Sequence, residues 1–143
     1  MSQAWTLQGT LTGLQILVVD DTDDSRRMAS RILTRCGATV YEASSVFDAL
    51  AQMETIVPDV LVSDISMPGR DGYDLIRALR ARERSTCSHI PALAMSGIVS
   101  EADRGLCLEL GFERFIAKPM DVKALVTHVA ELARSSVQAP ALH

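Results

Sequence analysis

Aromatic residues, paired cysteines and long apolar segments are scarce in this sequence of 143 residues, and each absence excludes a class of protein. Only 4% of the residues are aromatic, so a core has to be packed from Val, Ile, Leu, Ala and Met. The three cysteines, Cys36, Cys87 and Cys107, are widely spaced and form no CxxC pair. This spacing argues against a disulfide framework or a zinc site and favours reduced thiols.

Targeting and nucleic-acid-binding features are also missing. No apolar run approaches the roughly 20 residues of a membrane span, and the N-terminus lacks the basic and apolar regions of a signal peptide. The net charge is −4, and the arginine-rich residues 77–84 are expected to be solvated helix surface rather than a phosphate-binding patch. We therefore expect a cytoplasmic protein that contacts neither nucleic acid nor a membrane.

The composition, 48% apolar and 22% charged, is that of one globular domain. Short apolar runs alternate with helical periodicity five times, which is typical of βα units around a parallel sheet. We expect a doubly wound (βα)5 α/β domain over residues 14–134, between a leader at 1–13 and a flexible tail at 135–143. The expected strands are 16–19, 39–43, 59–63, 92–95 and about 114–117.

Local signals place several helix ends. Gly37 and Gly111 are expected to end the first and fourth helices, and Ser100 and Asp103 have the spacing of a capping box. Asp23 and Asp24 are expected to cap the first helix and complement its dipole. The three histidines are interpreted as surface or loop residues, and three methionines as packing residues; these are His89, His128 and His143, and Met67, Met95 and Met120.

Polar side chains stand at the ends of the expected strands. Asp20 and Asp21 follow the first strand, Asp64 ends the third, Ser96 follows the fourth and Lys118 the fifth. With the flavodoxin-like strand order 2-1-3-4-5, these ends meet at one crevice. Each pair of carboxylates would repel by about 4 kcal/mol at a separation of roughly 4 Å and an effective dielectric of 20. Lys118 supplies only one compensating positive charge. Such a cluster of oxygens suits Mg²⁺ or Mn²⁺. A metal ion beside a carboxylate, a hydroxyl and an ammonium is typical of sites that catalyse phosphoryl transfer.

Four ordered motifs carry a resemblance to a known family: ILVVDDTDDS, PDVLVSDISMPGRDGYDLIRALR, PALAMSG and FIAKPMD. Together they resemble the receiver domain of two-component response regulators, over about residues 15–134. The resemblance implies that Asp64 is the phosphoacceptor. It also implies that Asp20, Asp21 and the backbone carbonyl of Ser66 bind the metal ion with Asp64.

The same resemblance assigns the other polar residues of the crevice. Ser96 matches the hydroxyl that moves toward the phosphoryl group, Lys118 its ammonium partner, and Phe115 the aromatic switch. The bond between Lys118 and Pro119 would be cis, as in similar domains.

The implied function is a phosphorelay switch. Asp64 would take a phosphoryl group from a histidine kinase or a histidine phosphotransfer protein, and the chain would be no enzyme beyond phosphorylating and dephosphorylating itself. Its output would be a protein contact through the fourth helix, fifth strand and fifth helix. The opening TLTGLQILVVDD favours the C-terminal receiver of a hybrid histidine kinase over a stand-alone regulator.

Two alternatives stay open. Asp21, Asp23 and Ser25 have the DxDx[ST]-like spacing of a haloacid-dehalogenase-like phosphatase, whose nucleophile would be Asp21. That hypothesis lacks a later acidic pair and a cap insertion, and it leaves SDISMPGRDGY unexplained. The other alternative is an interaction module of the receiver fold that no longer accepts phosphate.

Overall fold

The alternating pattern of the sequence corresponds to a five-stranded parallel sheet in the computed structural model, which describes residues 7–65, 72–86, 89–97, 101–118 and 121–138. The strand order is β2-β1-β3-β4-β5, and every pair is parallel, so the predicted fold class is confirmed. The strands are β1 (Gln15–Val19), β2 (Thr39–Ala43), β3 (Val60–Asp64), β4 (Ala92–Ser96) and β5 (Arg114–Ala117).

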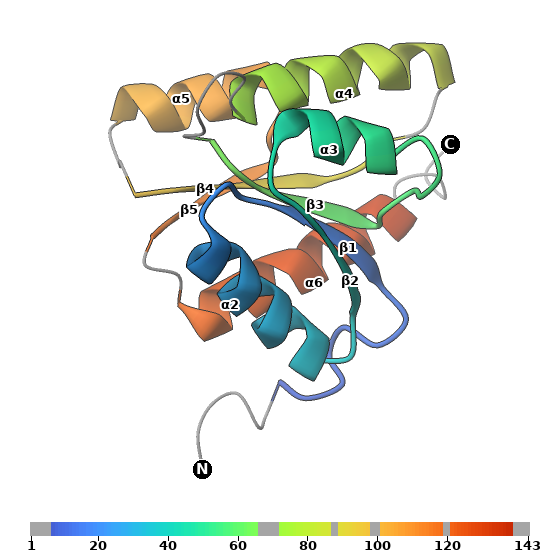
Figure 1. Ribbon diagram of the computed structural model, residues 1–143, viewed down its shortest axis with the longest axis vertical. Helices are drawn as coiled ribbons and strands as arrows, with labels where there is room; N and C mark the ends of the chain where they lie inside the picture. The colour runs from blue at the N-terminus through green and yellow to red at the C-terminus, as the bar shows by residue number, and fades with distance from the viewer. Residues whose placement is uncertain (1–6, 66–71, 87–88, 98–100, 119–120, 139–143) are drawn as a thin grey trace.

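Helices cover both faces of this sheet (Figure 1). Those that the structure describes are α2 (Asp23–Arg35), α3 (Val46–Gln52), α4 (Gly72–Thr86), α5 (Glu101–Leu110) and α6 (Val122–Gln138). One face packs against α2 and α6, and the other against α3, α4 and α5. Every residue of β3 and β4 is buried, which explains why these strands are nearly continuous apolar runs.

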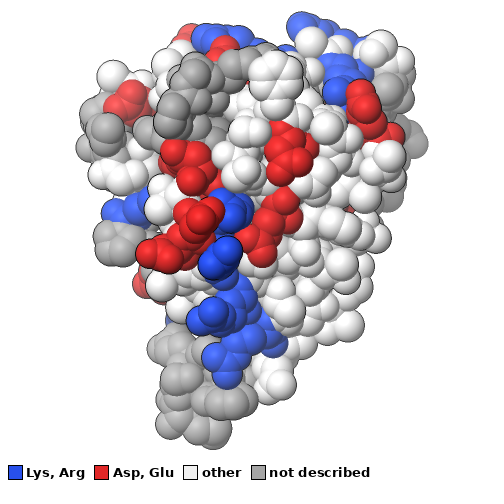
Figure 2. All heavy atoms as spheres, viewed as in Figure 1, with Lys and Arg blue, Asp and Glu red and all other residues white. Residues whose placement is uncertain are grey.

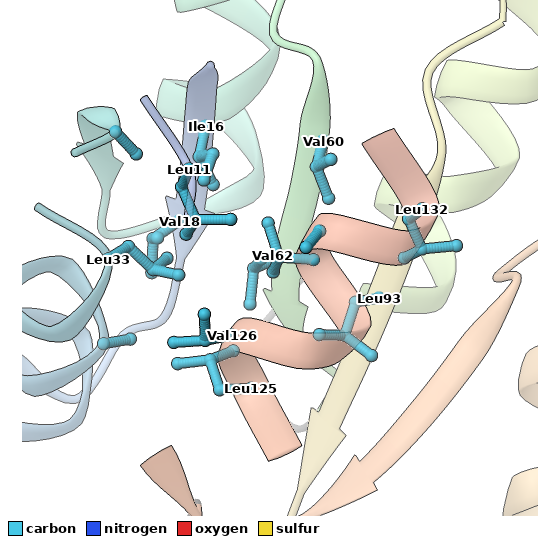
Figure 3. Packing of buried hydrophobic residues seen from close by; sticks show 14 of the residues in the cluster. Leu11, Ile16, Val18, Leu33, Val60, Val62, Leu93, Leu125, Val126 and Leu132 are labelled. Carbon is cyan, nitrogen blue, oxygen red and sulfur yellow. The ribbon is translucent and has the colours of Figure 1, made fainter. Parts of the chain in front are cut away.

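Aliphatic side chains form the core, as the low aromatic content predicts. On the α2 and α6 side, Leu33, Leu125 and Val126 pack against Val18 and Val62 of the sheet (Figure 3). Each of these five side chains is fully buried. At about 25 cal/mol for each Å² of apolar surface, a core of this kind supplies most of the stabilisation of such a domain.

The predicted glycine stops are confirmed. Gly37 follows the last residues of α2 with φ of 103°, and Gly111 follows α5 with φ of 123°. Both angles lie in the left-handed region, where glycine meets no Cβ penalty. Asp23 and Asp24 do not cap α2, because the N-cap is Thr22, but they lie in the first turn, where their charges complement the helix dipole.

Residues 82–86 belong to α4, and several of them are good helix formers. Two other expectations differ from the structure. Helix α6 extends past Arg134 to Gln138, into the expected tail. Residues 7–13 pack against the domain rather than extending away as a linker. Leu11 is fully buried, and its N–H donates a hydrogen bond to the Cys36 carbonyl at 2.9 Å.

The arginine-rich segment is only partly solvated surface. Arg80 is 17% exposed and donates hydrogen bonds to the carbonyls of Gly111, at 2.7 Å, and Ile90, at 2.8 Å. It also forms ion pairs with Glu83 and Glu113. Interpreting this arginine as solvated was therefore wrong. Glu83 lies on α4 itself, but the other partners come from the segments before β4 and β5, which the helical pattern of α4 does not reveal.

Other predictions concern single side chains. Cys36 and Cys107 are free buried thiols, and burial raises the pKa of each. Met95 is fully buried in the core, as expected. His89 is exposed but lies 2.9 Å from a Glu113 oxygen, and His128 contacts Arg114. Cys87, Met67, Met120, His143 and the predicted cap residue Ser100 lie outside the described residues.

Among the helices that the structure describes, none is both long enough and apolar enough to cross a lipid bilayer.

Candidate functional site

The polar residues predicted from strand ends do meet at one edge of the sheet. Asp20 directly follows β1, Asp64 ends β3, Ser96 ends β4 and Lys118 follows β5. The structure buries the first three, with exposures of 0% for Asp20, 4% for Asp64 and 1% for Ser96. Burying carboxylates costs free energy unless they are paired, so these side chains need compensating charge or hydrogen bonds.

Three carboxylates form the centre of the site. Oxygen atoms of Asp20, Asp21 and Asp64 lie within 4.8 Å of one another, so one ion could contact all three. Asp21 is exposed while the other two are buried, which opens the cluster to solvent on one side. Three carboxylates are hard oxygen donors, and this donor set fits Mg²⁺ or Mn²⁺.

Lys118 provides the positive charge inside the cluster. Its Nζ donates a hydrogen bond to Asp20 Oδ2 at 2.8 Å and lies 3.6 Å from Asp64 Oδ2. The Lys118 N–H donates to the Ser96 carbonyl at 2.8 Å, which fixes the ends of β4 and β5 relative to each other. One ammonium is thus shared between two carboxylates that come from different strands.

Hydrogen bonds hold the side chain, the carbonyl and the N–H of Asp20. Its Oδ1 accepts a hydrogen bond from the Thr22 N–H at 3.0 Å, and its own N–H donates to the Ala43 carbonyl at 3.1 Å. Its backbone carbonyl accepts a hydrogen bond from Arg26 Nη1 at 3.0 Å. The loop after β1 therefore has a well-defined conformation.

Sequence reasoning missed Arg26, which is buried beside the site with an exposure of 9%. Besides the Asp20 carbonyl, it binds Asp23 at 2.7 Å and Glu42 at 3.0 Å. The hydrogen bond from Arg26 lowers the pKa of Asp23, and the same bond raises the pKa of Arg26. The available signal was an arginine three residues after Asp23, at the spacing of a helical ion pair.

Gly72 is a second residue whose role becomes clear only in the structure. A Cβ at this position would lie 2.6 Å from the Asp64 carbonyl oxygen and 2.6 Å from Ile65 Cα. The start of α4 therefore touches the backbone of the strand end that carries Asp64. Only glycine permits this approach without moving one of the two segments.

Phe115 lies on β5, with a partly exposed side chain that packs at the border of the core beneath α5. The guanidinium carbon of Arg104 on α5 is 5.4 Å from the centre of its ring, within the range of a cation–π interaction. The predicted aromatic switch is thus in contact with a neighbouring helix.

Some predicted features are not brought together or lie elsewhere. Ser66 and Pro119 are outside the described residues, so the carbonyl ligand and the cis bond stay predictions. Asp23, which the phosphatase alternative requires, is paired with Arg26. Among the described residues, the group of carboxylates that could hold a metal ion consists of Asp20, Asp21 and Asp64.

Comparisons with known proteins agree with this geometry. The family model described as the response regulator receiver domain matches residues 16–130. An uncharacterised 14.6 kDa protein of Leptolyngbya boryana is 38% identical over 122 residues, covering 85% of this chain and 92% of the relative. The response regulator PleD of Caulobacter vibrioides is 36% identical over 123 residues, covering 84% of this chain and 26% of that protein.

A solved structure is similar as well. The signal receiver domain of a histidine kinase from Syntrophus aciditrophicus has a TM-score of 0.76 and 28% identity, covering 86% of this chain and 92% of that one. This chain therefore spans nearly all of the Leptolyngbya relative and that receiver domain, but about a quarter of PleD.

Proposed function

This chain belongs to the response regulator receiver domain family of two-component signalling, and on that premise we propose that Asp64 is its phosphoacceptor. The observation that carries the proposal is the position of this buried carboxylate at the end of β3, within reach of both Lys118 and the acidic pair. Asp64 is only 4% exposed and lies among other acids, so keeping its charge there costs free energy. A chemical role for this carboxylate would explain why the fold places it there.

The proposed step is a direct transfer of a phosphoryl group. An oxygen of Asp64 attacks the phosphorus atom of a phosphohistidine, an acyl phosphate forms, and the phosphorus–nitrogen bond breaks. The released imidazole takes up a proton. Lys118 faces the same carboxylate at 3.6 Å, so its ammonium is placed to stabilise negative charge on the transferred group.

We propose that Asp20, Asp21, Asp64 and the backbone carbonyl of Ser66 hold a Mg²⁺ ion, which Mn²⁺ can replace. The ion would neutralise charge on the phosphoryl oxygens during transfer. Support comes from the three carboxylates, whose oxygens lie within 4.8 Å of one another, and from the absence of nitrogen and sulfur donors among them.

The proposed response to phosphorylation involves Ser96 and Phe115. The added phosphoryl oxygens would draw the Ser96 hydroxyl and Lys118 toward Asp64, and the Phe115 ring would follow into the space vacated. The face made by α5, β5 and α6 would then be read by a downstream protein. Moving a two-state equilibrium from 1:99 to 99:1 takes about 5.5 kcal/mol, which several charge-assisted hydrogen bonds can supply.

We further propose a histidine kinase or a histidine phosphotransfer protein as phosphodonor, a cytoplasmic location, and no contact with nucleic acid or membrane. Free buried thiols at Cys36 and Cys107 are consistent with a reducing compartment. We propose residues 14–134 as the domain, with residues 7–13 packed against it and its last helix extending to Gln138. A receiver of a hybrid histidine kinase remains our preferred context, supported by the similarity to the Syntrophus kinase receiver.

Phosphorylation with acetyl phosphate and Mg²⁺ tests this function. Intact-protein mass spectrometry should show the mass of one added phosphoryl group on the wild type and on Asp24→Asn, an exposed acid on α2, but not on Asp64→Asn. A label that survives Asp64→Asn and disappears in Asp21→Asn would favour the phosphatase alternative. No label from acetyl phosphate or any kinase would favour the interaction module.

A further inference from the structure

Arg26 connects the metal-binding loop to two other elements. Its Nη1 donates to the Asp20 carbonyl at 3.0 Å, its Nε to Glu42 on β2 at 3.0 Å, and its Nη2 to Asp23 on α2 at 2.7 Å. The side chain is nearly buried, so these three contacts fix the direction of its planar donors. Figure 2 shows acidic and basic side chains side by side on the face that Figure 1 presents.

The hydrogen bond from Arg26 to the Asp20 carbonyl affects the backbone of Asp21 as well as that of Asp20. That carbonyl belongs to the planar peptide between Asp20 and Asp21, so fixing its direction also restricts the position of the Asp21 backbone. The Asp20 side chain is held separately, by the Thr22 N–H and by Lys118. Asp21 is exposed, and its orientation depends on the backbone that carries it.

We propose that Arg26 is a positioning residue for the divalent cation, which holds the peptide between Asp20 and Asp21 so that the Asp21 carboxylate faces Asp20 and Asp64. This inference rests on the proposed metal site. It assigns a role to a residue that touches neither the ion nor the phosphoryl group.

Electrostatics alone makes the opposite prediction. A guanidinium beside an acidic cluster repels a cation, and removing it would also release the charges of Asp23 and Glu42. If Arg26 acted only through its charge, neutralising it would tighten cation binding. If it positions Asp21, neutralising it weakens cation binding, so the sign of the change separates the two.

The test measures Mn²⁺ binding to the full chain by electron paramagnetic resonance of the free ion. We expect Arg26→Met to bind Mn²⁺ about tenfold more weakly than the wild type, the scale typical of groups that orient metal ligands. Arg26→Lys should be intermediate, because an ammonium keeps the charge but not the fork of donors. The matched control is Arg27→Met, the next and exposed residue of α2, with a change below about twofold.

A second variant separates positioning from stability. Glu42→Gln removes one ion-pair partner but leaves the bond from Arg26 to the Asp20 carbonyl, so it should lower stability to urea and change Mn²⁺ affinity less than about threefold. Unchanged or tighter Mn²⁺ binding by Arg26→Met, or by Arg26→Lys if the methionine variant does not fold, would overturn the inference and leave the proposed function standing. A wild type that binds no Mn²⁺ would overturn both.

Discussion

Asp64 and Asp20 are both buried carboxylates, yet their surroundings differ. Asp20 accepts hydrogen bonds from Lys118 at 2.8 Å and from the Thr22 N–H at 3.0 Å, whereas Lys118 is 3.6 Å from Asp64. The shared ammonium therefore compensates Asp20 better than Asp64. Oxygens of Asp64 also lie within 4.8 Å of those of Asp20 and Asp21, so the residue proposed to react stands among like charges.

This asymmetry predicts that Asp64→Asn stabilises the protein when no metal ion is bound. Removing one carboxylate from the cluster leaves the Lys118 to Asp20 pair intact and relieves repulsion. We expect a gain of about 1 kcal/mol in the free energy of unfolding, a size common when a functional charge is neutralised. Urea unfolding in EDTA measures it, and added Mg²⁺ should reduce the difference because the ion binds the wild type better.

Asp20→Asn is the matched control for that experiment. It removes a carboxylate from the same cluster, but this carboxylate is the one that pairs with Lys118 at 2.8 Å. The lost ion pair offsets the relief of repulsion, so we expect no gain in stability. An Asp64→Asn protein less stable than the wild type in EDTA would contradict the account of charge at this site.

At the scale of residues, the position of a side chain along its strand could be used to predict the site, but its hydrogen-bond and ion-pair partners could not be predicted. Asp20, Asp64, Ser96 and Lys118 could be predicted to lie together because the ends of parallel strands meet whatever the side chains are. The partner of Arg26 on β2 is 16 residues away in the sequence, and no local pattern indicates it. Long side chains reach their partners only through the fold.

At the scale of elements, α5 contains a glycine that its structure does not require. Gly105 is exposed, and a Cβ built on it meets no atom within 4 Å. Glycine inside a helix costs about 0.5–1 kcal/mol relative to alanine. This helix also carries Arg104, whose guanidinium lies over the Phe115 ring. A helix weakened beside the proposed switch residue is suited to a change of packing.

Gly105→Ala should therefore stabilise the protein by about 0.5–1 kcal/mol, because alanine fits the open space and loses less backbone entropy on folding. The midpoint of thermal unfolding should rise by a few degrees, about 2–4 °C for each kcal/mol at this size. Circular dichroism at increasing temperature measures the change.

Gly111→Ala provides the contrast at the end of the same helix. Its φ of 123° is strained for alanine, and the new Cβ would lie 2.9 Å from Arg80 Nε, so this variant should lose stability. If Gly105→Ala were also destabilising, α5 would have a packing requirement at that position that the structure does not account for.

Elements with strong local signals were predicted best. The strands and the glycine stops at Gly37 and Gly111 follow from apolar runs and from a conformation that few residues adopt. The end of α6 was placed too early, because small polar residues such as Ser135 and Ser136 are common in loops. The burial of Leu11 could not be predicted either, since nothing in residues 7–13 repeats with a helical or strand period.

At the scale of the whole molecule, two polar networks lie at opposite edges of the sheet. The site occupies the carboxyl ends of the strands, while Arg80 joins α4 to the segments that precede β4 and β5. Glu113 extends this second network, since its Oε1 accepts from the Ala92 N–H at 2.8 Å and its other oxygen lies 2.9 Å from His89. This second network therefore shares no residue with the site.

This separation predicts that Arg80→Met destabilises the fold without changing the chemistry. The substitution leaves the Gly111 and Ile90 carbonyls and two carboxylates without their shared donor, and we expect a loss of about 3 kcal/mol. The midpoint of thermal unfolding should fall by about 10 °C. At a temperature where the variant is folded, its rate of labelling by acetyl phosphate and Mg²⁺ should equal that of the wild type.

Arg84→Met, at an exposed position of the same helix, is the control and should change stability by less than about 0.5 kcal/mol. Equal stability of the two variants would mean that the Arg80 contacts contribute little. A fully folded Arg80→Met protein that is labelled more slowly would show that the two edges of the sheet are coupled, because within the described part of the chain Arg80 bonds to Glu83, Ile90, Gly111 and Glu113 and not to Asp64. The expected outcome, lower stability with unchanged labelling, requires that the strands whose ends carry the site, β1, β3, β4 and β5, hold it in place without the Arg80 contacts.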